Sequence, residues 1–171
     1  KVADYGHSKN PDMMIEGELG YLKGNSEVQT KIEISPEDYT KPEQARDFVA
    51  QTGVDRLAIV FGNIHGIVTE QEEHLDIEAL KAIRAGIPGM PLVLHGASGL
   101  PAEEIKLAIQ NGIANVHINT ELRVAYHDTL RKELESKPGE TTPYKYLDLA
   151  FEEVKRMVKE KLELFGSSGK I

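Results

Sequence analysis

Short apolar runs alternate with amphipathic stretches along most of the chain, and this alternation predicts an α/β fold. We expect strands at residues 13–19, 56–61, 91–95 and 114–118. Most of these runs are apolar in succession, which is typical of parallel strands buried on both faces. We expect helices at about 40–52, 76–85, 101–111, 119–137 and 143–165. A strand followed by a helix, four times over, predicts parallel pairing within one domain that covers residues 1–171.

Two local patterns predict where one helix starts and which face of another is buried. Thr40 and Glu43 have the T-x-x-E spacing of a capping box, which predicts a helix start with Thr40 or Lys41 near the cap and Pro42 in the first turn. Ile105, Ala108 and Ile109 have the spacing of an inward helical stripe. The polar stretch 20–38 is long for a loop in a compact domain, so we expect it to be functional or mobile.

The stretch PLVLHGASG, residues 91–99, is the most informative part of the pattern. Its apolar run predicts a buried strand that ends at His95. A turn of small residues follows, and backbone N–H groups in such a turn can approach an anion. The carboxyl ends of strands are where parallel α/β folds carry out their chemistry.

Composition and charge limit the classes of protein to which this chain can belong. The 171 residues, 40% of them apolar, are enough for one hydrophobic core. A formal net charge of −8 argues against nucleic acid or an anionic membrane as the main partner. No apolar stretch reaches the roughly 20 residues of a membrane span, no signal peptide is visible, and cysteine is absent. We expect a cytoplasmic protein. Because the chain opens at Lys1, on residues that look like the end of a helix, we also expect an upstream part.

Three predicted strand ends carry side chains that bind metals, namely Glu18, His65 and His95. Neighbouring parallel strands lie about 4.8 Å apart, so side chains at successive strand ends can converge on one ion. Two imidazoles and a carboxylate are a common zinc set. Glu16 lies on the same side of its strand as Glu18, by the two-residue period. A single histidine in such a place is more often structural, but two of them in the same context favour a metal site.

The same strand ends carry residues suited to phosphate. Backbone N–H groups at small turns and at helix N-termini bind phosphate. An ordinary turn glycine or helix cap explains any one of these positions, whereas their recurrence after consecutive strands favours phosphate. The candidates are Gly66, Gly96, Ser98, Asn119 and Thr120.

At these residues the sequence resembles the class II, metal-dependent fructose-bisphosphate aldolases and their tagatose-bisphosphate relatives. The matching segments follow the family's order and spacing: IEGELG (15–20), GNIHG (62–66), HGASG (95–99), GIANVHINTEL (112–122) and, more loosely, the tail GSSGKI (166–171). The resemblance implies a TIM-type (β/α)8 barrel. This chain would hold its second half, strands five to eight, and the C-terminal helices.

The resemblance also implies roles for the residues already singled out. His65 and His95 would bind Zn²⁺, and Glu18 would be a ligand or a close neighbour. The five turn residues would hold a substrate phosphate, and the same turns commonly hold a monovalent cation in the family. In the family's reaction, zinc chelates dihydroxyacetone phosphate and stabilises its enediolate, which attacks glyceraldehyde 3-phosphate.

This sequence departs from the family pattern at several places. The remaining zinc histidine and a catalytic aspartate belong to the first half of the barrel, which is absent. His117 stands where the family has an asparagine near the enediolate. Glu27 is an approximate substitute for the family's general base, although a solvated acidic loop is the alternative there. Lys145, beside Tyr144, is the candidate for the distal phosphate in place of an arginine.

The sequence leaves three alternative functions for the protein. The first is a zinc aldolase that acts on fructose or tagatose 1,6-bisphosphate as a full-length homo-oligomer, with residues 1–171 alone showing little or no turnover. The second is a non-catalytic half-barrel that binds metal or phosphate. The third is another phosphate-binding barrel enzyme.

Overall fold

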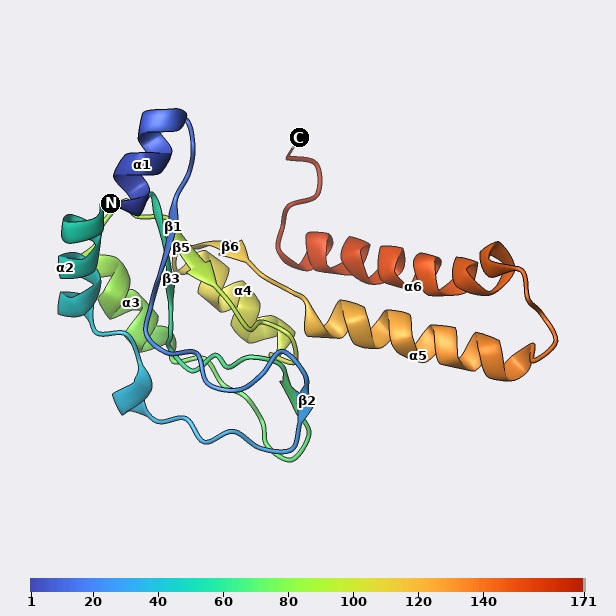
Figure 1. Cartoon of the computed structure of the whole chain (residues 1–171). Helices are drawn as coiled ribbons and strands as arrows, with labels where there is room; N and C mark the ends of the chain where they lie inside the picture. Colours follow the sequence, from blue (N-terminus) through green and yellow to red (C-terminus); the bar gives the residue numbers. More distant parts are fainter. Residues whose placement is uncertain (171) are drawn as a thin grey trace.

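A parallel sheet of four strands forms the centre of the protein, whose computed structural model describes residues 1–170 (Figure 1). The strands lie in the order β1 (Glu16–Leu19), β3 (Arg56–Ile59), β5 (Leu92–Leu94) and β6 (Ile113–Val116). All three neighbouring pairs are parallel. The four predicted strands and their parallel pairing are confirmed. The ladders are shorter than the apolar runs because the chain turns away after each strand.

Six α-helices are found within the described residues. Helices α2, α3 and α4 join the four strands of the sheet in turn, and they pack in a row, α2 against α3 and α3 against α4. The helices are α1 (Val2–Lys9), α2 (Pro42–Thr52), α3 (Ile77–Gly86), α4 (Ala102–Gln110), α5 (Thr120–Ser136) and α6 (Pro143–Leu164). All five predicted helices are therefore present, with ends that differ by a few residues at most.

The hydrophobic core lies between the sheet and the row α2–α4. Strand residues alternate between two faces, and Leu57, Ile59, Leu92 and Leu94 all belong to the core cluster that includes the helices. The predicted stripe of α4 faces this core, since Ile105 and Ala108 are fully buried and Ile109 packs beside them. The opposite face of the sheet is left to the residues between them in sequence.

Register places the polar strand residues on that opposite face. Glu16 pairs with Arg56 and Glu18 with Ala58 in the β1–β3 ladder. Val93 pairs with Asn115 in the β5–β6 ladder. Two residues further along each of these last strands come His95 and His117, which share the same face by alternation. The two-residue alternation and the register therefore direct Glu16, Glu18, His95 and His117 to one side of the sheet.

A second, very small parallel sheet pairs β2 (Val28–Gln29) with β4 (Ile67–Val68). It attaches the long loop 20–38, which also contains a 3₁₀ turn at Pro36–Asp38, to the segment that follows His65. The sequence analysis did not predict this pair, because two-residue strands leave no periodic pattern.

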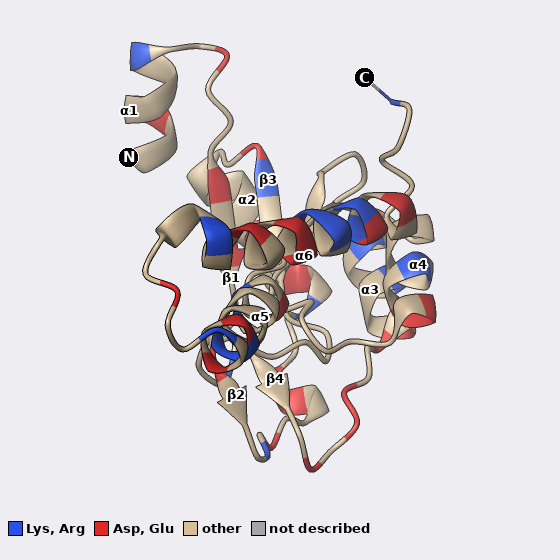
Figure 2. Ribbon diagram, turned by 90° about the vertical axis from the view of Figure 1, so that its right-hand side faces the viewer, with Lys and Arg blue, Asp and Glu red and all other residues tan. Residues whose placement is uncertain are grey.

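Helices α5 and α6 pack against each other as an antiparallel hairpin that extends to one side of the sheet (Figure 1). Basic and acidic residues alternate along the ribbon of α6 (Figure 2), and some are paired three residues apart, as Lys155 is with Glu152. The base of the hairpin is held by an ion pair between Lys161 and Glu121. At the end of α6 begins the tail 166–171, of which Ile171 lies outside the described residues.

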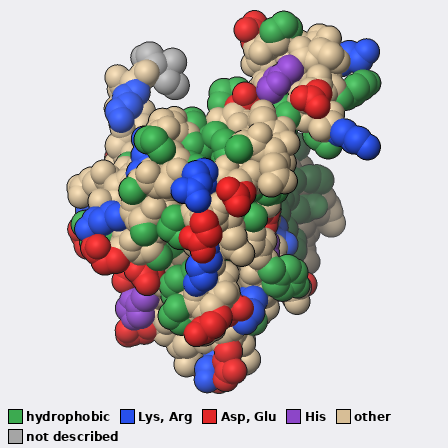
Figure 3. All heavy atoms as spheres, turned by 90° about the vertical axis from the view of Figure 1, so that its left-hand side faces the viewer, with side chains coloured by type: hydrophobic (Ala, Val, Ile, Leu, Met, Phe, Trp, Pro, Cys, Tyr) green, Lys and Arg blue, Asp and Glu red, His purple; other side chains and the backbone are tan. Residues whose placement is uncertain are grey.

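Charges of both signs are mixed on the side of the molecule formed by α1, α2 and α3. Figure 3 shows positive and negative side chains interspersed there among small apolar patches. Among the helices of residues 1–170, none is both long and apolar enough to cross a membrane.

The start of α2 confirms one of its two predicted caps. Lys41 is the cap residue, and its backbone N–H donates to Gln44 Oε1 at 3.2 Å. Thr40 is buried and serves the sheet instead. Its hydroxyl donates to the Leu19 carbonyl (2.8 Å) and accepts from the Val60 N–H (2.9 Å). The predicted capping box of Thr40 and Glu43 is wrong, because the Thr40 hydroxyl binds the backbone at the ends of β1 and β3 instead.

Thr40→Val is expected to lower the free energy of unfolding by about 2 kcal/mol, because it leaves a buried N–H and a buried carbonyl without the hydroxyl between them. Urea unfolding of the variant measures this loss. Thr69→Val is the matched control, since the Thr69 hydroxyl makes one exposed hydrogen bond, at 3.2 Å to the Gln29 carbonyl, and should cost roughly 0.5 kcal/mol or less. Equal losses in the two variants would refute the role assigned to Thr40.

Candidate metal centre and phosphate turns

The carboxyl ends of the parallel strands open into one pocket of about 150 Å³. Both strand-end histidines line it together with all five predicted turn residues. The lining residues are Ser26, His65, Gly66, His95, Gly96, Ser98, His117, Asn119 and Thr120. The structure thus brings Ser26 of the long loop together with residues from three segments that sequence reasoning had linked only by their position after strands.

A close group of three metal-binding side chains lies at this pocket. Glu16, His95 and His117 each offer a ligand atom, and these atoms lie within 4.8 Å of one another. His95 Nε2 is 2.8 Å from Glu16 Oε1, and its ring stacks on that of His117 with centroids 4.5 Å apart. Partial desolvation of the ring, reinforced by His95, holds the pKa of His117 below the ordinary histidine value. His117 is therefore neutral near pH 7, the form that binds metals.

One oxygen of the Glu16 carboxylate, Oε2, is buried and makes no hydrogen bond. Arg56 Nε lies 2.8 Å from Glu16 Oε2, yet the N–H does not point along that line, so both buried atoms lack a hydrogen bond. The contact is an ion pair with a free lone pair on the oxygen. Two imidazoles and a carboxylate with an unpartnered oxygen fit a divalent cation of the zinc type, so the residues present suit the metal that the sequence analysis expected.

The predicted ligand set and the close group share only His95. Glu18 is exposed, and its Oε2 lies 3.5 Å from His95 Nδ1. His65 lines the same pocket but does not belong to the group of three. Glu16 was visible to sequence reasoning as the partner of Glu18 on one side of β1, but the period alone could not decide which carboxylate approaches His95. Arg56 carried no signal at all.

Two turns approach the pocket so closely that only glycine fits. Gly96 has φ of +65°, and a Cβ on it would lie 1.9 Å from the Ile64 carbonyl oxygen. Gly66 has φ of +92°, and a Cβ there would lie 2.3 Å from the carbonyl oxygens of Asn25 and Glu27. Both conditions exclude any side chain. Behind these turns, buried Asn63 donates from Nδ2 to the His95 carbonyl at 2.9 Å and so links the ends of β3 and β5.

The tip of the long loop rests on the first turn of α5. Ser26 Oγ lies 3.3 Å from both Thr120 Oγ1 and Asn119 Nδ2, and Arg123 also binds Ser26. Gln29 secures the loop from the other side by donating to the His65 carbonyl at 2.9 Å. Ser26 was not among the predicted site residues, because a serine in a polar loop has no distinguishing pattern.

Like Glu18, two further predicted residues do not line the pocket. Glu27 is exposed and lines a neighbouring hollow beside Arg123 and His127. Lys145 sits in the first turn of α6, where it pairs with Glu140 at 3.0 Å. Figure 1 shows that this end of the hairpin is the one remote from the sheet. No contact of Lys145 within residues 1–170 supports the phosphate role, which stays a prediction.

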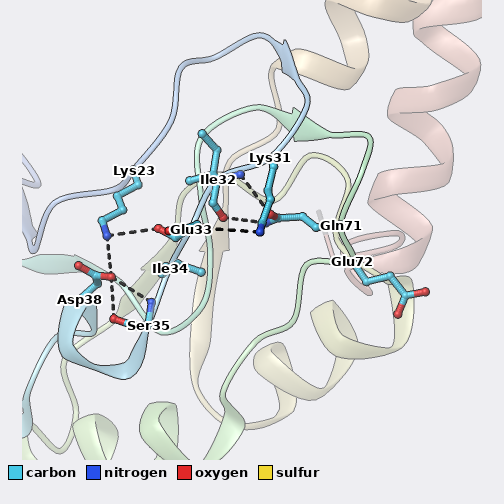
Figure 4. A pocket seen from close by; sticks show the side chains of 9 residues that line it. All are labelled: Lys23, Lys31, Ile32, Glu33, Ile34, Ser35, Asp38, Gln71 and Glu72. Atoms are coloured by element: carbon cyan, nitrogen blue, oxygen red, sulfur yellow. Dashed lines mark hydrogen bonds and ion pairs between the residues drawn. The ribbon is translucent and has the colours of Figure 1, made fainter.

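A larger hollow, of about 610 Å³, lies between the long loop and residues 71–72 (Figure 4). Its charged groups are already engaged. Lys23 donates to Asp38 at 2.8 Å and to the Glu33 carbonyl at 3.2 Å. Gln71 exchanges two hydrogen bonds with the backbone of Ile32. These contacts fold the loop on itself, and none of the metal or phosphate candidates lines this hollow.

Side chains able to bind a metal, next to tight glycine turns at the carboxyl ends of parallel strands, are typical of metal-dependent enzymes built on the TIM-type α/β barrel.

The chain belongs to the class II fructose-bisphosphate aldolase family, whose model, described as "Fructose-bisphosphate aldolase class-II", matches residues 1–170. It is 38% identical over 162 residues to the D-tagatose-1,6-bisphosphate aldolase subunit GatY of Klebsiella oxytoca, a match that covers 94% of this chain and 55% of that protein.

Two solved structures extend the comparison. The YdjI aldolase from Escherichia coli K12 superposes with a TM-score of 0.77 at 35% identity, covering 99% of this chain and 55% of the other. A putative fructose-1,6-bisphosphate aldolase from Coccidioides immitis gives a TM-score of 0.73 at 27% identity, covering 92% and 54%. The chain therefore spans about half the length of these relatives, and its sheet fits a TIM-like fold.

Proposed function

We propose that the whole protein is a metal-dependent aldolase that cleaves a ketose 1,6-bisphosphate to dihydroxyacetone phosphate and glyceraldehyde 3-phosphate. The observation that carries the proposal is the single pocket in which His65 and His95 meet the three predicted phosphate turns. Family membership supports it. In this proposal the chain supplies strands five to eight of the barrel and the helices that follow them, and the whole protein is a homo-oligomer.

We assign the metal to the His95 side of the pocket, and Zn²⁺ is the ion that its donors favour. His95 is the ligand common to both possible sets, joined by Glu16 and His117 or by His65 and Glu18. A divalent cation there supplies polarisation of a ketone oxygen, which makes the adjacent C–H acidic. Arg56 forms an ion pair with Glu16 and so holds that carboxylate in place, and His117 presents a neutral ring.

The substrate phosphate is assigned to the turns. Gly66 and Gly96 bring backbone close to the pocket, and Ser98, Asn119 and Thr120 surround the start of α5. Free N–H groups at a helix start attract an anion. These turns also offer carbonyl oxygens to a monovalent cation beside the phosphate. Glu27, next to the loop tip that touches α5, is proposed as the general base.

The sugar is fructose or tagatose bisphosphate. The K. oxytoca relative is named for tagatose bisphosphate and the C. immitis relative for fructose bisphosphate. The alternative, a non-catalytic half-barrel that binds metal or phosphate, is disfavoured by the family match. It would show anion binding without carbon–carbon cleavage.

A chelator is expected to abolish cleavage of the ketose bisphosphate by the full-length protein, and added Zn²⁺ should restore it, because the polarising charge is lost and regained. Formation of dihydroxyacetone phosphate, followed through a coupled reduction, measures this. Full cleavage after exhaustive chelation would contradict the metal-dependent mechanism, and an inactive, zinc-loaded full-length protein would favour the binding module.

A further inference from the structure

Glu73 is an unusual carboxyl group for its surroundings. It belongs to the acidic run Glu70–Glu73, yet it is only 6% exposed, while the neighbouring Glu72 side chain is 90% exposed. Its Oε2 is buried with no hydrogen-bond partner. A buried carboxyl without a partner costs stability, which raises the question of what it does there.

Glu73 lies between the turn that follows β5 and the short strand β4. Its Oε1 is 3.2 Å from the point where a Cβ on Gly99 would be, and Gly99, with φ of +94°, ends the turn that follows β5. The Val68 N–H of β4, in the segment that follows His65 and Gly66, favours the charged form of this carboxyl and so lowers its pKa. A side chain on Gly99 would press on Glu73, so the glycine keeps the two in contact.

The contact continues to the third turn. The Gly99 N–H donates to Glu121 Oε1 at 2.8 Å, and the Glu121 N–H donates to Ser98 Oγ at 3.4 Å. Glu121 is the second residue of α5, directly after Thr120. Glu73, Gly99, Glu121 and Ser98 therefore form a connected support behind the pocket.

The charges around Glu73 favour its neutral form. Glu121 faces it with a like charge, and Glu121 is itself paired with Lys161 of α6. His74, the next residue, pairs with Glu104 instead, at 2.8 Å. Burial, opposed by the Val68 N–H and reinforced by Glu121, raises the pKa of Glu73 to about 7. Its charge therefore changes in the physiological range.

We propose that uncharged Glu73 is a positioning residue, which holds the turn Ser98–Gly99 and the start of α5 in the arrangement that binds an anion in the pocket. Ionised Glu73 would add a second buried negative charge beside Glu121, repelling both that carboxylate and the bound anion. Anion affinity is then highest below pH 7 and falls as pH rises through 7. The role rests on the proposed function insofar as the natural anion is the phosphate of the substrate.

Sulfate, whose charge does not change between pH 6 and 8.5, is a suitable probe. Its affinity for the metal-free full chain can be measured calorimetrically for wild type, Glu73→Gln and the exposed control Glu72→Gln. Glutamine reproduces the neutral carboxyl in size. The ratio of affinities, Glu73→Gln over wild type, should be about one at pH 6 and rise to at least about threefold at pH 8.5, because one nearby charge is removed. Any effect of pH on the rest of the pocket is common to the two proteins and cancels in the ratio.

Two results would overturn the proposal. One is a Glu73→Gln variant that is weaker than wild type by the same factor at every pH, as a merely structural role requires. The other is the same pH-dependent gain in Glu72→Gln. A second measurement does not depend on any variant folding: sulfate should raise the NMR-measured pKa of Glu73 in wild type, by reciprocity, and an unchanged pKa would reject the idea. Sulfate binding needs neither metal nor turnover, so failure of the aldolase assignment alone leaves these results unaffected.

Discussion

His95→Ala is expected to weaken zinc binding by at least about 100-fold. Even residues that only orient metal ligands are worth about 10- to 100-fold in affinity, and a ligand itself is worth no less. His95 is in contact with every other candidate on its side of the pocket. It lies 2.8 Å from Glu16 and 3.5 Å from Glu18, and it stacks on His117.

Zinc affinity, measured by competition with a chromophoric chelator, tests this prediction. His127→Ala is the matched control, because His127 is exposed on α5 and pairs only with its neighbour Asp128 at 2.9 Å. It should bind zinc as wild type does. Undiminished affinity in His95→Ala, or an equal loss in both variants, would remove the basis of the metal centre.

Gly96→Ala is expected to reduce the free energy of unfolding by at least about 3 kcal/mol. A left-handed backbone costs a non-glycine residue about 1 kcal/mol. The added methyl would also meet the Ile64 carbonyl oxygen at 1.9 Å. That carbonyl belongs to backbone in the fully buried Phe61–Ile64 segment, so relief requires the ends of β3 and β5 to move apart.

Gly53→Ala separates the two causes. Gly53 ends α2 with φ of +67°, almost the value at Gly96, but a Cβ there meets nothing within 4 Å. This variant should lose only about 1 kcal/mol. Urea unfolding of both variants gives the comparison. If the two losses are equal, the close approach of the strand ends is not a constraint.

The fold could be predicted from the sequence because its strong signals are periodic or local. Apolar runs identified all four strands of the main sheet, and glycines and prolines marked the helix ends well. The errors came where tertiary contacts decided the outcome. Thr40 had the right spacing for a cap, but the ends of β1 and β3 use its hydroxyl.

The candidate site was predictable in its location and less so in its pairing. Residues that follow strands must gather at one edge of a parallel sheet, so His65, His95 and the turns were found together. Which carboxylate meets His95 depends on side-chain reach, which β1 leaves open between Glu16 and Glu18. Arg56, Ser26 and Glu73 act through contacts with residues distant in sequence, and no spacing in their own segments marks them.

Strands β1 and β6 lie at the two ends of the sheet order, and among residues 1–170 each is paired along one side only. Their other sides present unpaired backbone donors and acceptors, which tend to recruit any extended segment within reach. Solutions of this chain should therefore self-associate increasingly as they are concentrated. Affinities and unfolding curves are best collected at the lowest workable protein concentration, with light scattering to verify particle size.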